Sequence, residues 1–250
     1  MILAIDIGNT TISFAVLSGA RVVGKRVLWT KDAAKADGAL RSLKKKFPRV
    51  KEVVICSVAP KALKAVAPLA KRVFRRAPLV IGRDIKVPLK NNYKNPTHVG
   101  QDRLVGAYAA KMLYGYPAII IDFGTAITFD VINARGEYDG GIIVPGIRLS
   151  AQSLFRKTAM LPEILTFRAP RSIVGKTTKD SILSGLFYGY AALCNGLIGS
   201  LQEGFRKKAR VVITGGHTDI MKKFIRKNIT AVDSHLVFKG VFWAYIAAQK

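Results

Sequence analysis

The stretch that decides the fold reads ILAIDIGNTTISFAV at residues 2–16, and its pattern returns as IIIDFGTAITFDV at residues 119–131. Each copy has an apolar run, an aspartate, a glycine two residues later, an asparagine or threonine, and a second apolar run. Two apolar runs around a glycine turn are typical of a pair of antiparallel strands. Because one copy lies in each half of the chain, the pattern predicts a duplicated fold.

The segments around each copy extend this prediction. In both halves, three strands separated by short turns are followed by helices and further short strands. We therefore expect an α/β chain with two mixed β-sheets flanked by helices, divided into an N-terminal domain of residues 1–113 and a C-terminal domain of residues 114–250. The expected meander strands span residues 2–6, 11–17 and 22–28 in the first half, and 118–122, 126–132 and 137–144 in the second.

The composition is that of a basic globular chain. Half of the 250 residues are hydrophobic, and the formal net charge is +26 at pH 7. Such a charge attracts anions and polyanions. The lysines and arginines recur at helical spacing between apolar residues, and no zinc-finger spacing or RNA-binding aromatic phrase accompanies them. We expect a solvated basic surface rather than a nucleic-acid site.

Cysteine usage and hydropathy indicate the compartment. Cys56 and Cys194 are far apart in the sequence and lie in apolar surroundings, as buried thiols of a reducing compartment do. The N-terminus has no signal-peptide pattern, and no apolar run reaches the length of about 18 residues that a membrane helix needs. The sequence predicts a cytoplasmic protein without a membrane partner.

The two glycine turns have the residues of a phosphate site. Gly8 and Gly124 let the backbone come close to a ligand, and threonine or asparagine side chains at both turns add hydrogen-bond donors. Asp6 and Asp122 end the preceding strands. A carboxylate beside a phosphate repels it unless a cation lies between them, so the pattern implies Mg²⁺ or a monovalent ion. Together these features favour a phosphoryl-transfer enzyme.

Two other glycine motifs are weaker. Gly175-Lys176-Thr177 resembles the end of a P-loop, but Pro170 stands where the first glycine is required. Gly215-Gly216 follows a predicted strand, where it could let a nucleoside lie against the backbone or could be a plain strand-to-helix turn. Both interpretations of the glycine pair stay open.

Asp102 and Arg103 begin a predicted helix after a polar loop. A carboxylate there could accept the proton of an attacking hydroxyl, and the arginine could hold a carboxylate substrate. An aspartate at a helix N-terminus is also favourable for the helix itself. The residues alone leave both roles open for Asp102.

Taken in order, these motifs resemble the type III pantothenate kinase family of the actin/sugar-kinase/Hsp70 superfamily. The matching residues are Asp6 to Thr10, the loop from Tyr93 through Pro96 to Arg103, Asp122 to Thr125, Pro145-Gly146 and Gly215-Gly216. The resemblance implies a duplicated actin-like (ribonuclease H-like) fold with an ATP cleft between the halves. It also implies a homodimer that uses Mg-ATP and a monovalent cation, K⁺ or NH₄⁺, to phosphorylate pantothenate to 4′-phosphopantothenate, the first step of coenzyme A biosynthesis.

The resemblance also assigns roles to individual residues. Asp102 would be the catalytic proton acceptor, Asp122 would hold the monovalent cation, and Asp6 would lie near Mg²⁺. Substrate binding would involve Tyr93, Gly100, Gln101, Asp102, Arg103 and Thr178. ATP binding would involve Asp6, Ile7, Gly8, Asn9, Thr10, Thr11, Ile12, Ser13 and Thr125.

Four positions depart from the family pattern: Gln101, Gly106, Thr177 and Leu183. None of them removes a proposed catalytic group. Two alternatives remain beside the kinase. One is a non-catalytic, transcription-related accessory factor that uses the basic surface, and the other is a kinase for a different small hydroxy-acid.

Overall fold

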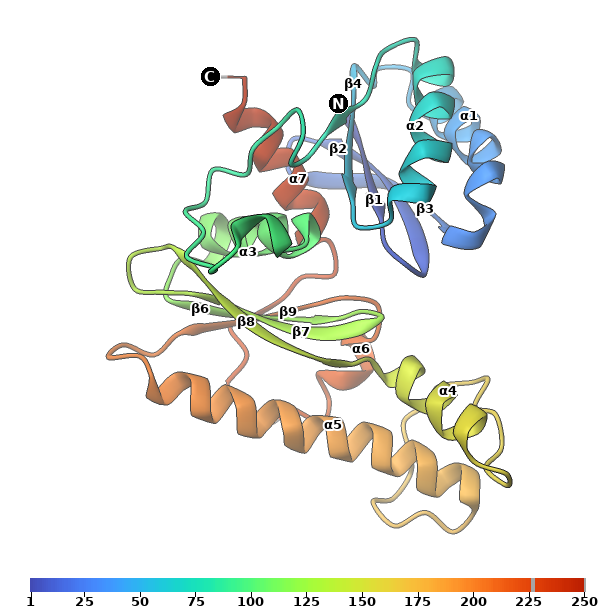
Figure 1. Cartoon of the computed structure of the whole chain (residues 1–250), viewed down its shortest axis with the longest axis vertical. Helices are drawn as coiled ribbons and strands as arrows, with labels where there is room; N and C mark the ends of the chain where they lie inside the picture. Colours follow the sequence, from blue (N-terminus) through green and yellow to red (C-terminus); the bar gives the residue numbers. More distant parts are fainter. Residues whose placement is uncertain (226–227, 250) are drawn as a thin grey trace. The chain divides into compact units, whose positions relative to one another are not determined.

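The computed structural model describes residues 1–225 and 228–249. The chain forms two compact units, one of Met1–Leu113 together with the segment from His235, the other of Tyr114–Ser234 (Figure 1). Each unit is an α/β structure built on a mixed sheet, as the sequence predicts.

The first unit has a five-stranded sheet in the order β3-β2-β1-β4-β5. Neighbours β1 and β2 are antiparallel, as are β2 and β3, whereas β4 runs parallel to both β1 and β5. The strands are β1 (Ile2–Ile7), β2 (Thr11–Ser18), β3 (Arg21–Trp29), β4 (Glu52–Ser57) and β5 (Leu79–Val80). The helices are η1 (Thr30–Lys35), α1 (Ala36–Lys46), α2 (Pro60–Phe74), η2 (Pro96–His98), α3 (Gln101–Tyr114) and α7 (Leu236–Ala247).

The second unit repeats this topology. Its sheet has the order β10-β9-β6-β7-β8, so β6 to β10 match β1 to β5 in both position and direction. Both second strands also have a register shift near their ends, at Val16/Leu17 and at Val131/Ile132. The duplication predicted from the repeated phrase is confirmed. The elements are β6 (Ala118–Phe123), β7 (Ala126–Ile132), β8 (Tyr138–Pro145), α4 (Ile147–Lys157), α5 (Thr178–Glu203), β9 (Arg210–Thr214), α6 (Thr218–Met221) and β10 (Ala231–Val232).

The central strand of the first sheet is buried on both faces. Leu3, Ile5 and Ile7 belong to the apolar cluster that includes α1 and α2, while Ile2 and Ala4 belong to the cluster that includes α7. Successive side chains of a strand point to opposite faces. Asp6 therefore follows Ile2 and Ala4 on the α7 side, at the end of the strand.

The expected C-terminal domain of residues 114–250 would include helix α7. The structure groups this helix with the first unit instead. Phe238, Val241 and Ala244 are buried in the same cluster as Ile2 and Ala4 of β1. At Gly240 the helix comes so close to α3 that an added Cβ would lie 2.0 Å from the Val105 carbonyl oxygen. The favourable free energy of burying this apolar helix explains why it packs against β1, although the two are far apart in the sequence.

Helix α5 is long and apolar enough to cross a membrane by length and composition, the single such helix in the part of the chain that the structure describes. Its buried residues, Ile182, Leu186, Phe187, Ala191 and Ile198 among them, belong to the core of the second unit together with β6 and β9. This packing is that of a core helix, and one apolar helix is weak support for a membrane span.

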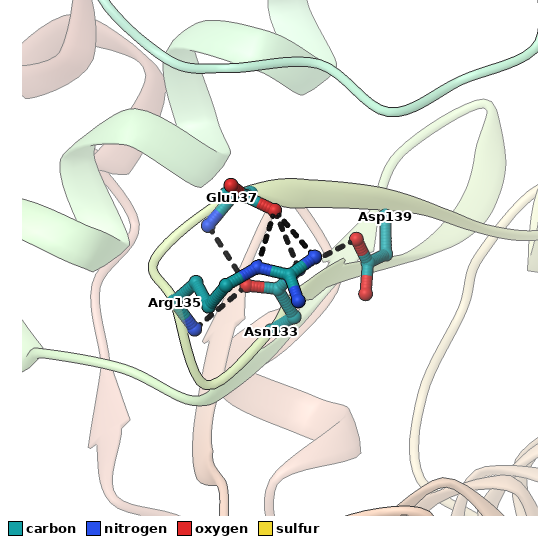
Figure 2. Close-up of polar contacts among 4 residues, drawn as sticks. All are labelled: Asn133, Arg135, Glu137 and Asp139. Carbon is teal, nitrogen blue, oxygen red and sulfur yellow. Dashed lines mark hydrogen bonds and ion pairs between the residues drawn. The ribbon is translucent and has the colours of Figure 1, made fainter.

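A polar network closes the hairpin between β7 and β8 (Figure 2). Asn133 Oδ1 accepts hydrogen bonds from the backbone N–H groups of Arg135 at 2.8 Å and Glu137 at 3.1 Å. The Arg135 guanidinium forms an ion pair of 2.9 Å with Glu137, and Asn133 Nδ2 donates to Asp139. The network lies at the end of β7 opposite the glycine turn, so these charged groups stabilise the hairpin and are not candidates for the site.

Candidate active site

The first glycine turn connects β1 to β2. Gly8, Asn9 and Thr10 form the turn, and the Gly8 N–H donates to the Thr11 carbonyl at 2.9 Å. Asp6 is paired with Ser13 across the two strands, next to the turn. The side chains of Ile7 and Ile12 are fully buried, so only their backbone atoms could contact a ligand.

A second carboxylate of the same unit acts on the residue that pairs with Asp6. Cys56 is the register partner of Asp6 on β4 and is fully buried. The pKa of the Cys56 thiol is raised well above its ordinary value. Burial is the main cause, and the negative charges of Asp6 and Asp102 add to it. Asp6 and Asp102 therefore both act on the thiol near the end of β4, although 95 residues separate them in the sequence. The thiol itself stays protonated and is a packing group.

Asp102 is held in a partly buried position in the first turn of α3. Its Oδ1 accepts a hydrogen bond from the Arg103 backbone N–H at 2.8 Å. Burial raises the pKa of Asp102 above its ordinary value, against the opposing effect of that hydrogen bond and of the Arg103 charge. A raised pKa makes a carboxylate a better proton acceptor once it is ionised.

The residues around Asp102 pack closely against its carboxylate. An added Cβ at Gly100 would lie 2.5 Å from Asp102 Oδ1, so only glycine fits there without displacing the carboxylate. The Gln101 side chain lies against Gly82, whose φ is +86°. Gln101, a departure from the family pattern, therefore supports the turn before the polar loop.

Of the two remaining predicted substrate residues, Tyr93 belongs to the first unit and Thr178 to the second. Tyr93 is in the loop before α3, where its backbone N–H donates to Asn91 Oδ1 at 3.0 Å and its side chain is exposed. Thr178 is the exposed first residue of α5. The hydroxyl of Thr177 caps this helix by accepting from the Asp180 N–H, which gives that residue a structural role. Leu183 is buried in the core of the second unit, and Gly106 faces Val237 of α7.

The second glycine turn is the centre of a cluster in the second unit. Asp122 is the last residue but one of β6. An added Cβ at Gly124 or Gly215 would lie 3.5 Å or 2.3 Å from Asp122 Oδ1. The Gly146 N–H donates to the Thr125 carbonyl at 3.0 Å. The structure thus brings Asp122, Thr125, Gly146 and Gly215 together from three segments of the chain.

A group of one histidine, one phenylalanine and one arginine, which no sequence motif connects, lies beside this turn. The His217 N–H donates to the Phe123 carbonyl at 3.4 Å, and the imidazole contacts the Phe167 ring edge to face at 6.1 Å between centroids. The Arg148 guanidinium lies over the same ring at 4.9 Å. Burial and the Arg148 charge lower the pKa of His217, so the imidazole is neutral at pH 7. The spacing and the types of these residues give no signal in the sequence that they lie close together.

The carboxylates at the two turns fit a cation that is bound partly by the protein and partly by an anionic ligand such as a phosphate. No group of three or more His, Cys, Asp or Glu side chains that could hold a metal occurs in residues 1–225 and 228–249. Mg²⁺ is usually held by one or two carboxylates together with substrate phosphates, which Asp6 suits. Asp122 offers the oxygen donor that hard cations prefer, at a turn rich in backbone carbonyls.

The comparisons with known proteins decide the family. A family model described as type III pantothenate kinase matches residues 2–200. The chain is 40% identical to the type III pantothenate kinase of Persephonella marina, over 98% of each chain. This chain belongs to the type III pantothenate kinase family. The resemblance inferred from the sequence motifs is confirmed, and a member of this family is a kinase that uses ATP with a divalent metal.

Solved structures agree with the fold. A protein of Campylobacter jejuni titled as a conserved putative Baf family transcriptional activator has a TM-score of 0.65 at 18% identity, with 99% of each chain covered. A putative 2-dehydro-3-deoxygalactonokinase of Sinorhizobium meliloti has a TM-score of 0.59 at 14% identity, also with 99% of each covered. At these identities the similarity concerns the fold alone, and it supports the predicted duplicated actin-like architecture of the type III pantothenate kinase family.

Proposed function

We propose that this protein transfers the γ-phosphate of ATP to pantothenate, producing 4′-phosphopantothenate for coenzyme A biosynthesis. The observation that carries the proposal is the position of Asp102 in a chain of this family. This carboxylate lies in the first turn of α3 beside Gly100, whose added Cβ would lie 3.4 Å from Val58, and the Val58 N–H donates to the carbonyl of Ile7 before the first glycine turn. Asp102 would accept the proton of the pantothenate hydroxyl as the phosphoryl group is transferred. Phosphoryl transfer otherwise requires positioning and charge neutralisation more than covalent chemistry.

The other predicted residues would bind the two substrates. Residues 6–13 would bind the ATP phosphates through turn N–H groups and hydroxyls, and Thr125 would contact ATP. Gly100, Gln101 and Arg103 would form the pantothenate pocket, with Tyr93 and Thr178 contributing further contacts. The Arg103 guanidinium suits the pantothenate carboxylate.

Two cations would complete the site. Mg²⁺ near Asp6 would neutralise phosphate charge when ATP is bound. Asp122 would hold K⁺ or NH₄⁺ at the second turn, where its carboxylate is packed between two glycines.

We also propose that the chain forms a homodimer through its second unit. Helix α4 and the loop that follows it lie beside the start of α5 (Figure 1) and expose large apolar side chains, with Phe155 41% and Met160 92% exposed. The same region exposes Leu149, Leu154, Leu165, Ile173 and Val174. A globular protein seldom leaves so many apolar side chains in water unless a partner covers them.

Sedimentation equilibrium is expected to give twice the 27.3 kDa mass of the chain. Phe155→Asp should shift the protein toward the monomer, because it would place a charge within the buried interface. Val27→Asp is the control, since Val27 is 50% exposed on an edge strand of the first unit. A wild-type monomer, or equal dissociation in both variants, would contradict the proposal.

Both cysteines are free and buried. This agrees with the cytoplasm as the compartment, which is also where we propose that the protein acts.

A coupled assay of ADP release tests the reaction. We expect ADP formation only when pantothenate, Mg²⁺ and K⁺ or NH₄⁺ are all present, and a panel of other hydroxy-acids should give little turnover. Faster turnover of another hydroxy-acid would assign a different substrate. A salt-dependent gel shift on DNA without kinase activity would instead support the transcription-related alternative, which the family match does not favour.

A further inference from the structure

Thr30 is hydrogen-bonded to the first glycine turn. It is the first residue after β3 and makes two hydrogen bonds to carbonyl oxygens of the turn. Its backbone N–H donates to the Thr10 carbonyl at 2.9 Å, and its Oγ1 donates to the Gly8 carbonyl at 2.7 Å. One residue thus fixes two peptide groups of the turn.

These bonds determine where the turn N–H groups point. In a planar trans peptide the C=O and the following N–H point in opposite directions. Because Thr30 draws the Gly8 and Thr10 carbonyls toward itself, the N–H groups of Asn9 and Thr11 face the other side of the turn. Two N–H groups on one side of a turn form a favourable site for an anion.

The Thr30 hydroxyl also takes the place of a bond that would close the hairpin. In a closed two-residue turn, Gly8 and Thr11 would exchange two backbone hydrogen bonds. Of that pair, the structure records the bond from the Gly8 N–H to the Thr11 carbonyl at 2.9 Å. The Gly8 carbonyl accepts from Thr30 Oγ1 instead.

The duplicated fold shows that this arrangement is a general feature of the two turns. Gly146 is the first residue after β8, as Thr30 is the first after β3, and its N–H donates to the Thr125 carbonyl at 3.0 Å. An added Cβ at Gly146 would lie 2.2 Å from that carbonyl oxygen, so no side chain fits. Both units therefore use the same backbone contact, and the first adds a hydroxyl.

We propose that Thr30 is a positioning residue for nucleotide binding, which orients the Asn9 and Thr11 N–H groups toward the phosphates through its hydroxyl bond to Gly8. This inference rests on the proposed function in one respect, that the first turn binds the phosphates of ATP. Thr30 itself acts through the turn and does not contact the reacting atoms.

Isothermal titration calorimetry with the non-hydrolysable analogue AMP-PNP and Mg²⁺ tests the proposal. Thr30→Val keeps the shape of the side chain and removes its donor, so we expect affinity about tenfold weaker, the effect of losing one hydrogen bond. Thr30→Ser keeps the hydroxyl and should stay within about twofold of the wild type. In kinetic assays Thr30→Val should raise the KM for ATP and leave the KM for pantothenate unchanged.

Thr230→Val is the matched control, because Thr230 Oγ1 accepts a hydrogen bond of 3.0 Å from the Val211 N–H of the second unit, at the end of β9 opposite Gly215. Its affinity for AMP-PNP should equal that of the wild type. Wild-type affinity in Thr30→Val, or equal losses in Thr30→Val and Thr30→Ser, would overturn the proposal. Absence of AMP-PNP binding to the wild type would overturn it together with the nucleotide site. Binding without turnover of pantothenate would refute only the reaction, and the comparison of variants would still decide the role of Thr30.

Discussion

Replacing Asp102 with Asn will lower kcat by about 10²- to 10⁴-fold, the range that loss of a general base produces. The amide has nearly the shape of the carboxylate, and its oxygen can still accept the hydrogen bond from the Arg103 N–H. The fold and the affinity for AMP-PNP should therefore be retained. Steady-state kinetics with pantothenate, together with calorimetry of nucleotide binding, measure both effects.

The pH dependence provides a second readout of the same group. As the proposed proton acceptor, Asp102 can act only when it is ionised, and burial raises its pKa. The rate should therefore fall as the pH is lowered through that pKa, at higher pH than an ordinary aspartate with a pKa of about 3.9 would cause. Asp102→Asn should lose this acidic limb together with most of its activity.

A suitable control is Asp37→Asn, because Asp37 is a surface carboxylate of the same unit that pairs with Arg41 and Arg72. Exposed ion pairs contribute little to stability, and Asp37 belongs to neither glycine turn, so its kcat should match the wild type. A near-normal rate in Asp102→Asn would contradict the role as proton acceptor. Asp102 would then have the other role that the sequence allows, which is to stabilise the N-terminus of its helix.

The sequence predicts the sheets of this fold well because their signals are local. Leu3, Ile5 and Ile7 alternate with residues of the opposite face, and the glycine turn follows at once, so two neighbouring strands can be recognised within fifteen residues. The duplication then follows from seeing the phrase twice. The sequence places helix α7 in the C-terminal half, whereas the structure groups it with the first unit. Its partners on β1 lie more than 200 residues away, and no periodicity reports such a contact.

The candidate site also contains some residues that local sequence patterns reveal and others that they do not. Asp6 and Asp122 lie within the recognisable phrase, whereas Thr30 and Gly146 are connected to the turns only through the third strand of each unit. A threonine at a strand end has no signal of its own. Its role depends on strand register, which places the residue after β3 against Thr10.

The glycine pair after β9 shows what a structure adds to an ambiguous motif. Gly215 has a φ of +98°, and an added Cβ would lie 2.3 Å from Asp122 Oδ1 and 2.6 Å from the Phe123 nitrogen. Gly216 has neither restriction, since nothing lies within 4 Å of its added Cβ. The two residues look alike in the sequence, but only Gly215 is required by the backbone conformation and by the packing against Asp122.

We therefore expect Gly215→Ala to lower the free energy of unfolding by about 3 kcal/mol, through the positive φ and the overlap with β6. The overlap would also displace the Asp122 carboxylate, so activity that remains should need a much higher K⁺ concentration. Chemical denaturation and a K⁺ titration of the rate measure these effects. Gly216→Ala is the matched control for stability and should unfold like the wild type. If Gly215→Ala kept both the stability and the K⁺ dependence of the wild type, the close approach of Gly215 to Asp122 would have no part in the proposed cation site.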